Sequence, residues 1–340
     1  SASSLSKQAR DLSNSAYMPG KEGAAGMRQD PAALQAEARG VAKQSGFSAI
    51  SAMTALQKFT AKTGDLESGR AILADMAKFS RATGAELDDM VDAAGDISNA
   101  LGDAADKPRL MKDVMRAFIA QGKEGAVEIK DLAVQMAKLG GASSLISGDR
   151  SHSIATMGAL TQMTRAKGGA VSATQAATSL GSFMATFSKQ ARVNAMENAG
   201  IKLREKDGLL RDPRSLIIDI LKATGGDANK IGKMVADQGA QRVLRGWTAT
   251  YNQAGGGDAG IKAVNQEFDI LMKSVTQMAE IEDSYRAAMS EGEVKVQLVN
   301  NSLEEMAGKL NKDLGPSIAR LVPDIERAAK AFANAIGYLT

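Results

Sequence analysis

The sequence predicts an all-α protein of helical hairpins and longer helices, with one small β-hairpin near residues 201–210. Hydrophobic residues make up 44% of the 340 residues but aromatic residues only 4%, so Ala, Leu and Met must fill the core. Small and flexible apolar side chains suit closely packed helices better than sheets, which favour β-branched and aromatic residues. Apolar residues also recur at helical spacing through most of the chain, and glycines interrupt them at regular distances.

The chain is expected to begin with a loose segment. Residues 1–29 are rich in Ser, Gly and Ala and show little periodicity beyond that of one short helix. A helix then begins at Asp30-Pro31, because Asp is a good N-cap and Pro suits the first helical position. Its apolar pattern ends near Gly46.

Six glycines follow the ends of successive apolar-periodic stretches, where a helix commonly ends with a left-handed glycine. They are separated by 18, 20, 18, 20 and 18 residues: Gly46, Gly64, Gly84, Gly102, Gly122 and Gly140. Taken in pairs they give a period of 38 residues and predict three hairpin-like repeats over about 46–168. One hairpin cannot bury its apolar face alone, so the repeats should stack. The third repeat has about eight extra residues around 144–150.

The stretch GIKLREKDGLLRDPRS (200–215) departs from the helical pattern. A long helix over about 172–199 is expected to end at Gly200. Asp207-Gly208 then fits a two-residue hairpin turn, which needs positive φ at both positions. Asp212-Pro213 fits the cap and first residue of the next helix. These four residues, Asp207, Gly208, Asp212 and Pro213, form the predicted structural turn.

The remaining pattern divides the chain. We expect residues 30–253 to form a helical core module and the glycine-rich stretch 254–260 to be a linker. Residues 261–340 should form long helices suited to a coiled coil or to self-association. The segment 324–339 is amphipathic, and one face carries Ile325, Ala328, Ala329, Phe332, Ala333 and Ile336.

Composition argues against most chemistry. The chain has no Cys and one His, His152, so we expect no metal site and no thiol chemistry, and we assign no cofactor and no catalytic residue. The 42 basic and 39 acidic residues are too evenly balanced to indicate nucleic-acid binding. Residues 22–34 resemble a lytic transglycosylase motif, but the Glu general acid expected about ten residues upstream is missing, and Glu22 lies too close. The sequence therefore predicts a protein that is not an enzyme.

The order of segments resembles the core region of phage tail tape measure proteins over roughly residues 32–335. The short helices with KTGDLESG and ATGAELDD, the stretch AGIKLREKDGLLRDPRSLIIDIL and the C-terminal NKDLGPSIARLVPDIERAAKAF carry the resemblance. It implies a virion structural protein that lies in the tail lumen, sets tail length during assembly in the host cytoplasm, and leaves ahead of the DNA. The implied partners are further copies of the chain, the tail tube protein, tail-tip or baseplate hub proteins, tail assembly chaperones and the host envelope.

Two other function classes remain open from the sequence. One is a tail-carried module that degrades the cell wall or penetrates a membrane. The other is a bacterial helical-repeat scaffold unrelated to phage. Clearing of peptidoglycan by the purified chain would favour the first, and a monomer that binds a bacterial partner would favour the second.

Overall fold

The computed structural model describes residues 2–18, 27–124, 126–273, 278–306 and 309. These residues are predominantly helical, as the sequence predicts. The strands among them are β1 (Tyr17–Met18) and β2 (Met27–Arg28), which pair antiparallel. None of the described helices has both the length and the hydropathy needed to cross a membrane.

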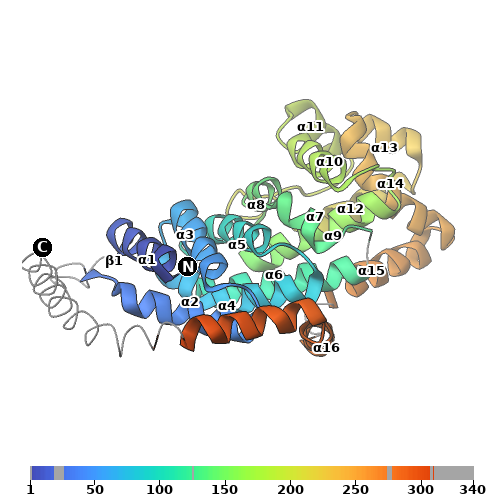
Figure 1. The fold of residues 1–340 in the computed structure, drawn as a ribbon. Coiled ribbons are helices and arrows are strands. Elements are labelled where there is room, and N and C mark those ends of the chain that lie inside the picture. Colours follow the sequence, from blue (N-terminus) through green and yellow to red (C-terminus); the bar gives the residue numbers. More distant parts are fainter. Residues whose placement is uncertain (1, 19–26, 125, 274–277, 307–308, 310–340) are drawn as a thin grey trace, which may run out of the picture.

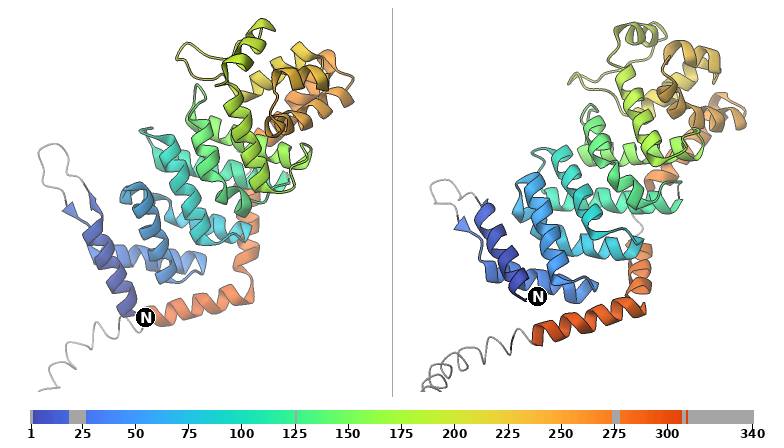
Figure 2. Two further views of the ribbon diagram at one scale, coloured as in Figure 1. Left: turned by 90° about the horizontal axis from the view of Figure 1, so that it is seen from above. Right: turned by 45° about the horizontal axis from the view of Figure 1, so that its top comes forward.

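Most helices belong to hairpins that stack side by side in two layers (Figures 1 and 2). One layer contains the first helix of each hairpin: α1 (Ala2–Ser15), α3 (Ala49–Thr63), α5 (Leu87–Leu101), the pair α7 (Ile129–Val134) and α8 (Met136–Ser143), and α10 (Ala173–Thr186). The other layer contains the second helices: α2 (Pro31–Ser45), α4 (Leu66–Thr83), α6 (Lys107–Glu124), α9 (Arg150–Ala166) and α14 (Gln238–Gln253).

Each helix packs against its hairpin partner and against the equivalent helix of the next hairpin. The order α1–α3–α5–α8–α10 in one layer is matched by α2–α4–α6–α9–α14 in the other. The apolar faces thus form one continuous core, in which Phe59, Phe79 and Phe118 are fully buried. Long polar side chains add bridges between neighbouring hairpins, such as Lys62 Nζ to Asp96 Oδ1 at 2.7 Å. The stack therefore gains its stability from contacts between neighbours, as repeat proteins do.

The N-terminal segment is not loose, which corrects the expectation for residues 1–29. Residues 2–15 form α1, and its side chains Leu5, Ala9 and Leu12 are buried against the stack. Their spacing of four and three residues is helical, although Ser and Lys surround them in the sequence. Because α1 packs on α2 and α3, this short helix is the first member of the stack.

The helix expected over 172–199 is divided in two. It ends as α10 at Thr186 and resumes as α11 (Gln190–Asn198). Phe187 lies at the break, is fully buried, and meets the Phe183 ring edge-on with 4.9 Å between centroids. The helix therefore stops where the Phe187 side chain packs into the core.

The segment between α10 and α14 is an insertion into the last hairpin. After α11 come an irregular stretch, α12 (Pro213–Thr224) and α13 (Ala228–Met234). The irregular stretch contains no named strand, so the predicted β-hairpin at 201–210 is wrong. One antiparallel bridge, Arg204 with Leu210, closes a turn there. Leu210 directs its own backbone groups to a different segment, donating to Leu145 O (2.9 Å) and accepting from Ser147 N (2.8 Å).

The glycine-rich stretch before α15 (Gly257–Lys273) is a tight reversal, which corrects the expectation of a linker. Gly255, Gly256 and Gly257 all have positive φ. The Tyr251 hydroxyl accepts a hydrogen bond from Gly257 N (2.8 Å), and α15 packs directly on α14. The fully buried Phe268 of α15 belongs to the same apolar core as the stack.

After this reversal the chain returns along the second layer, past its helices in the opposite order. The helix α15 contacts α9 and α6, and α16 (Met278–Met289) packs on α4. A further helix, residues 292–306, reaches the end of α2 (Figure 1). We call residues 278–306 the C-terminal arm. The amphipathic segment 324–339, with its predicted face, lies outside the described residues.

Candidate functional site

The predicted turn at Asp207-Gly208 has a different geometry from the one expected. Gly208 has φ +81°, but Asp207 is not among the described residues with positive φ. Gly208 N donates to Glu205 O (3.1 Å) and Glu205 N donates to Leu209 O (2.9 Å), which makes a three-residue loop that ends in a left-handed glycine. Only Gly208 has the positive φ that this turn needs. Asp207 contributes to the turn through its side chain.

The Asp207 carboxylate joins two irregular segments. Oδ1 accepts from Leu209 N (2.9 Å) and Oδ2 accepts from the Ser147 hydroxyl (2.6 Å). The hydrogen bond from Ser147, followed by the one from Leu209, lowers the pKa of Asp207. Ser147 lies in the extra residues around 144–150, and Ile146 forms a parallel bridge with Leu210. The extra residues and the turn are therefore two halves of one junction.

Asp212 and Pro213 lie at the start of α12, as expected, with Pro213 buried in the first turn. The Asp212 side chain accepts no hydrogen bond from the helix, so it is not the cap that the sequence predicts. The neighbouring Arg211 instead holds this corner, through Nη1 to Lys202 O (2.7 Å) and to Asp219 Oδ2 (2.8 Å).

The six repeat glycines divide into two kinds. Gly46, Gly64, Gly84 and Gly102 follow the ends of α2, α3, α4 and α5 and have φ between 60° and 71°. Gly122 and Gly140 lie inside α6 and α8, which corrects the expectation that each ends a helix.

Gly122 and Gly140 allow close approach of the backbone. A Cβ at Gly122 would lie 3.2 Å from Val127 O, and one at Gly140 would lie 2.9 Å from the Ala100 Cβ. The regularly spaced glycines thus serve two purposes: four end helices with positive φ, and two allow close packing inside helices.

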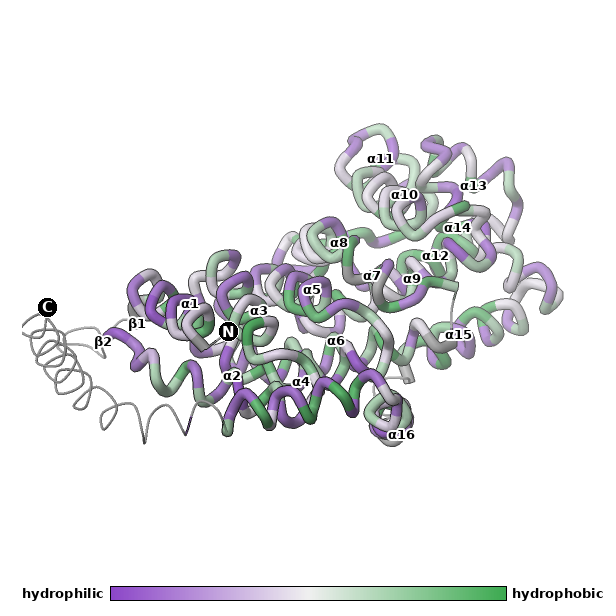
Figure 3. The backbone as a smooth tube through the Cα atoms, viewed as in Figure 1, coloured by the Kyte–Doolittle hydropathy of each residue, from purple (hydrophilic) through white to green (hydrophobic). Residues whose placement is uncertain are grey.

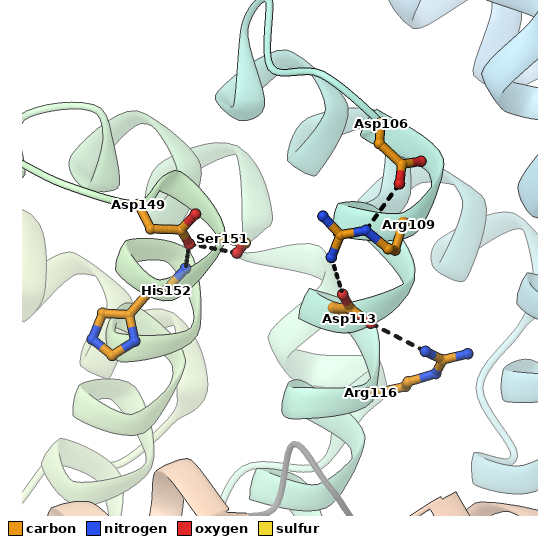
Figure 4. A network of polar contacts seen from close by, with 7 residues as sticks. All are labelled: Asp106, Arg109, Asp113, Arg116, Asp149, Ser151 and His152. Carbon is orange, nitrogen blue, oxygen red and sulfur yellow. Dashed lines mark hydrogen bonds and ion pairs between the residues drawn. The ribbon is translucent and has the colours of Figure 1, made fainter.

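The lone His152 is part of a helix start (Figure 4). Asp149 Oδ1 accepts from His152 N (2.7 Å) and from the Ser151 hydroxyl (2.6 Å), which is an ordinary N-cap of α9. The bond from Ser151 and then the one from His152 N lower the pKa of Asp149. In the same figure the imidazole points away from the charged row formed by Asp106, which precedes α6, and by Arg109, Asp113 and Arg116 of α6. These features are helix caps and surface ion pairs.

The described residues contain no cluster suited to a metal ion. No group of three or more His, Asp or Glu side chains there is arranged to hold a metal ion. Glu22, the residue considered for transglycosylase chemistry, lies outside the described residues.

The C-terminal end of α2 collects long-range contacts that the sequence pattern did not indicate. Helix ends leave carbonyl groups without partners inside the helix. Here side chains from three segments donate to carbonyl groups in the last turn of α2 and just beyond it. Asn301 Nδ2 donates to Ala42 O (3.0 Å) and Phe47 O (2.8 Å), and the Tyr285 hydroxyl donates to Gln44 O. Arg81 of α4 donates to the two carbonyls between them, Ser45 O and Gly46 O, both at 2.9 Å. We call this set the α2 clasp.

Ion pairs and one close backbone approach complete the clasp. Lys78 pairs with Glu282 and Lys43 pairs with Glu305. Burial lowers the pKa of Arg81 and raises the pKa of Tyr285. Val294, a buried residue of the arm, comes so near Gly46 that a Cβ at Gly46 would lie 2.6 Å from Val294 Cγ1. Through the clasp, Asn301 contacts Phe47, which lies 254 positions earlier in the chain.

Comparison with protein families gives a match over residues 64–242, which is more than half of the chain. The matching family is described as Phage-related minor tail protein. The chain belongs to this family. The matched residues run from the end of α3 into α14. They include both halves of the junction, the extra residues around 144–150 and the turn at 203–211. Comparisons with curated proteins and with solved structures gave no match.

Family membership makes the chain a phage tail protein, and therefore one associated with the virion. The sequence resemblance had pointed to the same assembly. The matched residues 64–242 cover most of the stacked hairpins.

Proposed function

We propose that the chain is a region of a tape measure protein with a structural and non-catalytic role. In this proposal it lies in the tail lumen during assembly, with the tail tube protein and the tail-tip or baseplate hub proteins as partners, and tail assembly chaperones hold it in the host cytoplasm beforehand. It leaves ahead of the DNA at infection and meets the host envelope. The family match over the stacked hairpins is the observation that carries the proposal.

The stacked form and an extended form differ greatly in length. Packed helices lie about 8–10 Å apart, so each hairpin adds about 10 Å along the stack. The hairpin of α5 and α6 with its loops, residues 87–128, would span about 63 Å as one continuous helix at ~1.5 Å per residue. This region therefore contributes to tail length as a ruler only when the hairpins unstack.

The folded form suits a different task within the same protein. A compact stack has a defined surface on which tail-end proteins assemble, and its contacts are repeated and local. We therefore propose that the folded stack acts at the start of assembly or lies at one end of the tail. Unstacked residues would take part in length measurement.

The test is deletion of residues 87–128 from the phage gene that encodes the chain, with tail length measured by electron microscopy. Tails shorter by about 63 Å would mean that the region acts as extended ruler. Tails of unchanged length, or shorter by about 10 Å, with lost infectivity would mean that it acts as a folded module. A tandem duplication of the same residues is the matched control, because a ruler lengthens by the amount that the deletion removes.

Other results would overturn the proposal. Normal tails with normal infectivity would show that the region has no role in length or delivery. Peptidoglycan clearing by the purified chain, abolished by Glu22→Gln, would assign it to a cell-wall-degrading module instead.

A further inference from the structure

The helix 292–306 has two faces with different surroundings. Its inner face packs on the end of α2 through Val294 and Asn301, which are buried, and through Glu305, which pairs with Lys43. Its outer face carries large apolar side chains that are 57–61% exposed: Val296, Val299, Leu303 and Met306. We call these four residues the outer stripe, and Figure 3 shows apolar residues recurring along this helix.

The outer stripe has the spacing of a coiled-coil seam. Its residues are separated by three, four and three positions, which is the alternation of a and d positions in a heptad. A helix that packs on one partner needs one apolar stripe. This helix already uses its inner face on α2, and the described residues leave the outer stripe largely exposed.

The sequence contains a second apolar stripe of the same kind, within the segment 324–339. Its residues are separated by four, three, four and three positions: Ile325, Ala329, Phe332, Ile336 and Leu339. The polar residues Arg327, Lys330 and Asn334 fall between them, so a helix formed by this segment would be apolar on one face only.

The two stripes match residue for residue if the two helices run antiparallel. In such a pair each a position of one helix faces a d position of the other. A single register then places an apolar residue opposite every member of the outer stripe, and the next pair in that register, Leu310 with Ile325, is also apolar. The four pairs are Val296 with Leu339, Val299 with Ile336, Leu303 with Phe332, and Met306 with Ala329.

The connection between the two stripes is long enough for this reversal. Residues 311–324 would join the two helices, and connections of about 2–8 residues already suffice between neighbouring helices of bundles. The connection contains Gly315-Pro316 and Pro323, and both residue types favour the end of a helix over its continuation.

Other occupants of the outer stripe are less favoured. A connection this short holds the segment 324–339 near the stripe at an effective concentration on the order of millimolar, which a separate molecule rarely reaches. A membrane surface would require Lys and Arg on the polar face of the helix. Residues 292–306 instead contain three Glu and one Lys: Glu293, Glu304, Glu305 and Lys295.

We propose that residues 324–339 fold back on the outer stripe, so that helix 292–306 and this segment form an antiparallel helical hairpin within one chain. The inner face of helix 292–306 stays on α2, and the segment covers the outer stripe from the other side. The proposal goes beyond the function proposed above and does not depend on it, because the two stripes match whether or not the protein measures tail length.

The first test uses the absence of Cys from the chain. The 340-residue double variant Met306→Cys with Ala329→Cys should form a disulfide within one chain under mild oxidation, because a disulfide needs Cα atoms within about 7 Å. Met306→Cys with Arg327→Cys is the matched control, since Arg327 lies at a similar distance along the chain but off the stripe. The first pair should cross-link on the order of tenfold faster than the control.

The second test is hydrogen exchange of the full chain, measured by mass spectrometry. Residues 324–339 should be protected, because a lone helix of about this length is only marginally stable in water. Leu303→Glu should lower that protection by on the order of tenfold, since it places a carboxylate opposite Phe332. Val171→Glu is the control: Val171 is 78% exposed and lies outside the arm. Protection of α2 should be unchanged in both variants, which shows that the stack remains folded.

Four outcomes overturn the proposal. Equal cross-linking rates for the two Cys pairs would show that the segment does not lie on the stripe. So would protection of 324–339 that is absent, or that Leu303→Glu leaves unchanged. Disulfides that form between chains and increase with protein concentration would assign the outer stripe to a second copy. Protection that arises only with vesicles of anionic phospholipid would assign it to a membrane surface.

Discussion

The returning C-terminal segment is held at its two ends by different kinds of contact. At its base, α15 packs on α14 through Trp247 and Phe268, which are fully buried and stacked with 3.8 Å between ring centroids. At its tip, the arm is held on α2 and α4 mainly by hydrogen bonds and ion pairs of the α2 clasp, with Ile281 and Val294 as buried apolar residues.

The two ends should therefore open at different free energies. Water replaces the hydrogen bonds of the clasp once it opens, so each contributes only about 1 kcal/mol net. Water does not compensate for the loss of the apolar contacts at the base. We expect the arm to detach from α2 and α4 while the stack and α15 remain folded, and local opening of this kind is general in proteins.

The largest effect should come from the base. Trp247→Ala is expected to lower the free energy of unfolding by about 3–5 kcal/mol, because it removes a fully buried ring and leaves a cavity beside Phe268. Urea unfolding followed by circular dichroism measures the loss. Ile270→Ala, at a 55% exposed position of α15, is the control and should change stability by at most about 0.5 kcal/mol. A loss below about 1 kcal/mol for Trp247→Ala would contradict the described packing.

An intermediate effect should separate the clasp from the stack. Gly46 and Gly64 have nearly the same backbone, with φ of +69° and +71°, and each follows a helix. An Ala at either position should cost about 1–2 kcal/mol of backbone strain. At Gly46 the added Cβ would also collide with Val294, whereas at Gly64 it meets nothing within 4 Å.

Gly46→Ala should therefore raise hydrogen exchange in residues 292–306, and Gly64→Ala should not. Mass spectrometry of exchange measures both variants under the same conditions. Equal exchange in the arm for the two variants would show that Val294 does not hold the arm on α2.

The smallest effect should be the pH dependence of the arm. The hydrogen bond from Lys78 lowers the pKa of Glu282, and the bonds from Lys43 and then Lys309 lower the pKa of Glu305. A carboxylate with a lowered pKa stabilises the docked arm above its ordinary pKa. This contribution is lost as the pH falls through the lowered value.

Exchange protection of residues 278–306, corrected for intrinsic rates, should thus decline at acidic pH below the ordinary range of Glu. The double variant Glu282→Gln and Glu305→Gln should show lower protection at neutral pH and a flatter profile. Because both carboxylates lie at the surface, solvent screening keeps the effect small. An identical pH profile for the double variant would show that these pairs do not hold the arm.

Much of the stack could be predicted from local features. Asp30 and Pro31 start α2, and Gly46, Gly64 and Gly84 end three successive helices, because capping and left-handed glycine are properties of a few adjacent residues. The α1 helix could have been found from the spacing of Leu5, Ala9 and Leu12.

Long-range contacts account for most of the errors. Leu210 pairs with the segment 145–147 as well as with Arg204, and only one antiparallel bridge remains of the expected hairpin. Gly122 and Gly140 look like helix ends because their spacing fits, but the neighbouring backbone and Ala100 explain them. Nothing in the local pattern near Asn301 indicates a contact with Ala42 and Phe47.

By itself the sequence determined the helical class, the hairpin spacing and most helix ends, since these follow from side-chain size, backbone preference and hydrogen bonds within one or two turns. The tertiary structure alone decided the return of the chain along the second layer, the junction at Asp207 and Ser147, and the α2 clasp. These depend on which distant surfaces meet when the apolar faces are buried together, and residues far apart along the chain carry no local signal of that meeting.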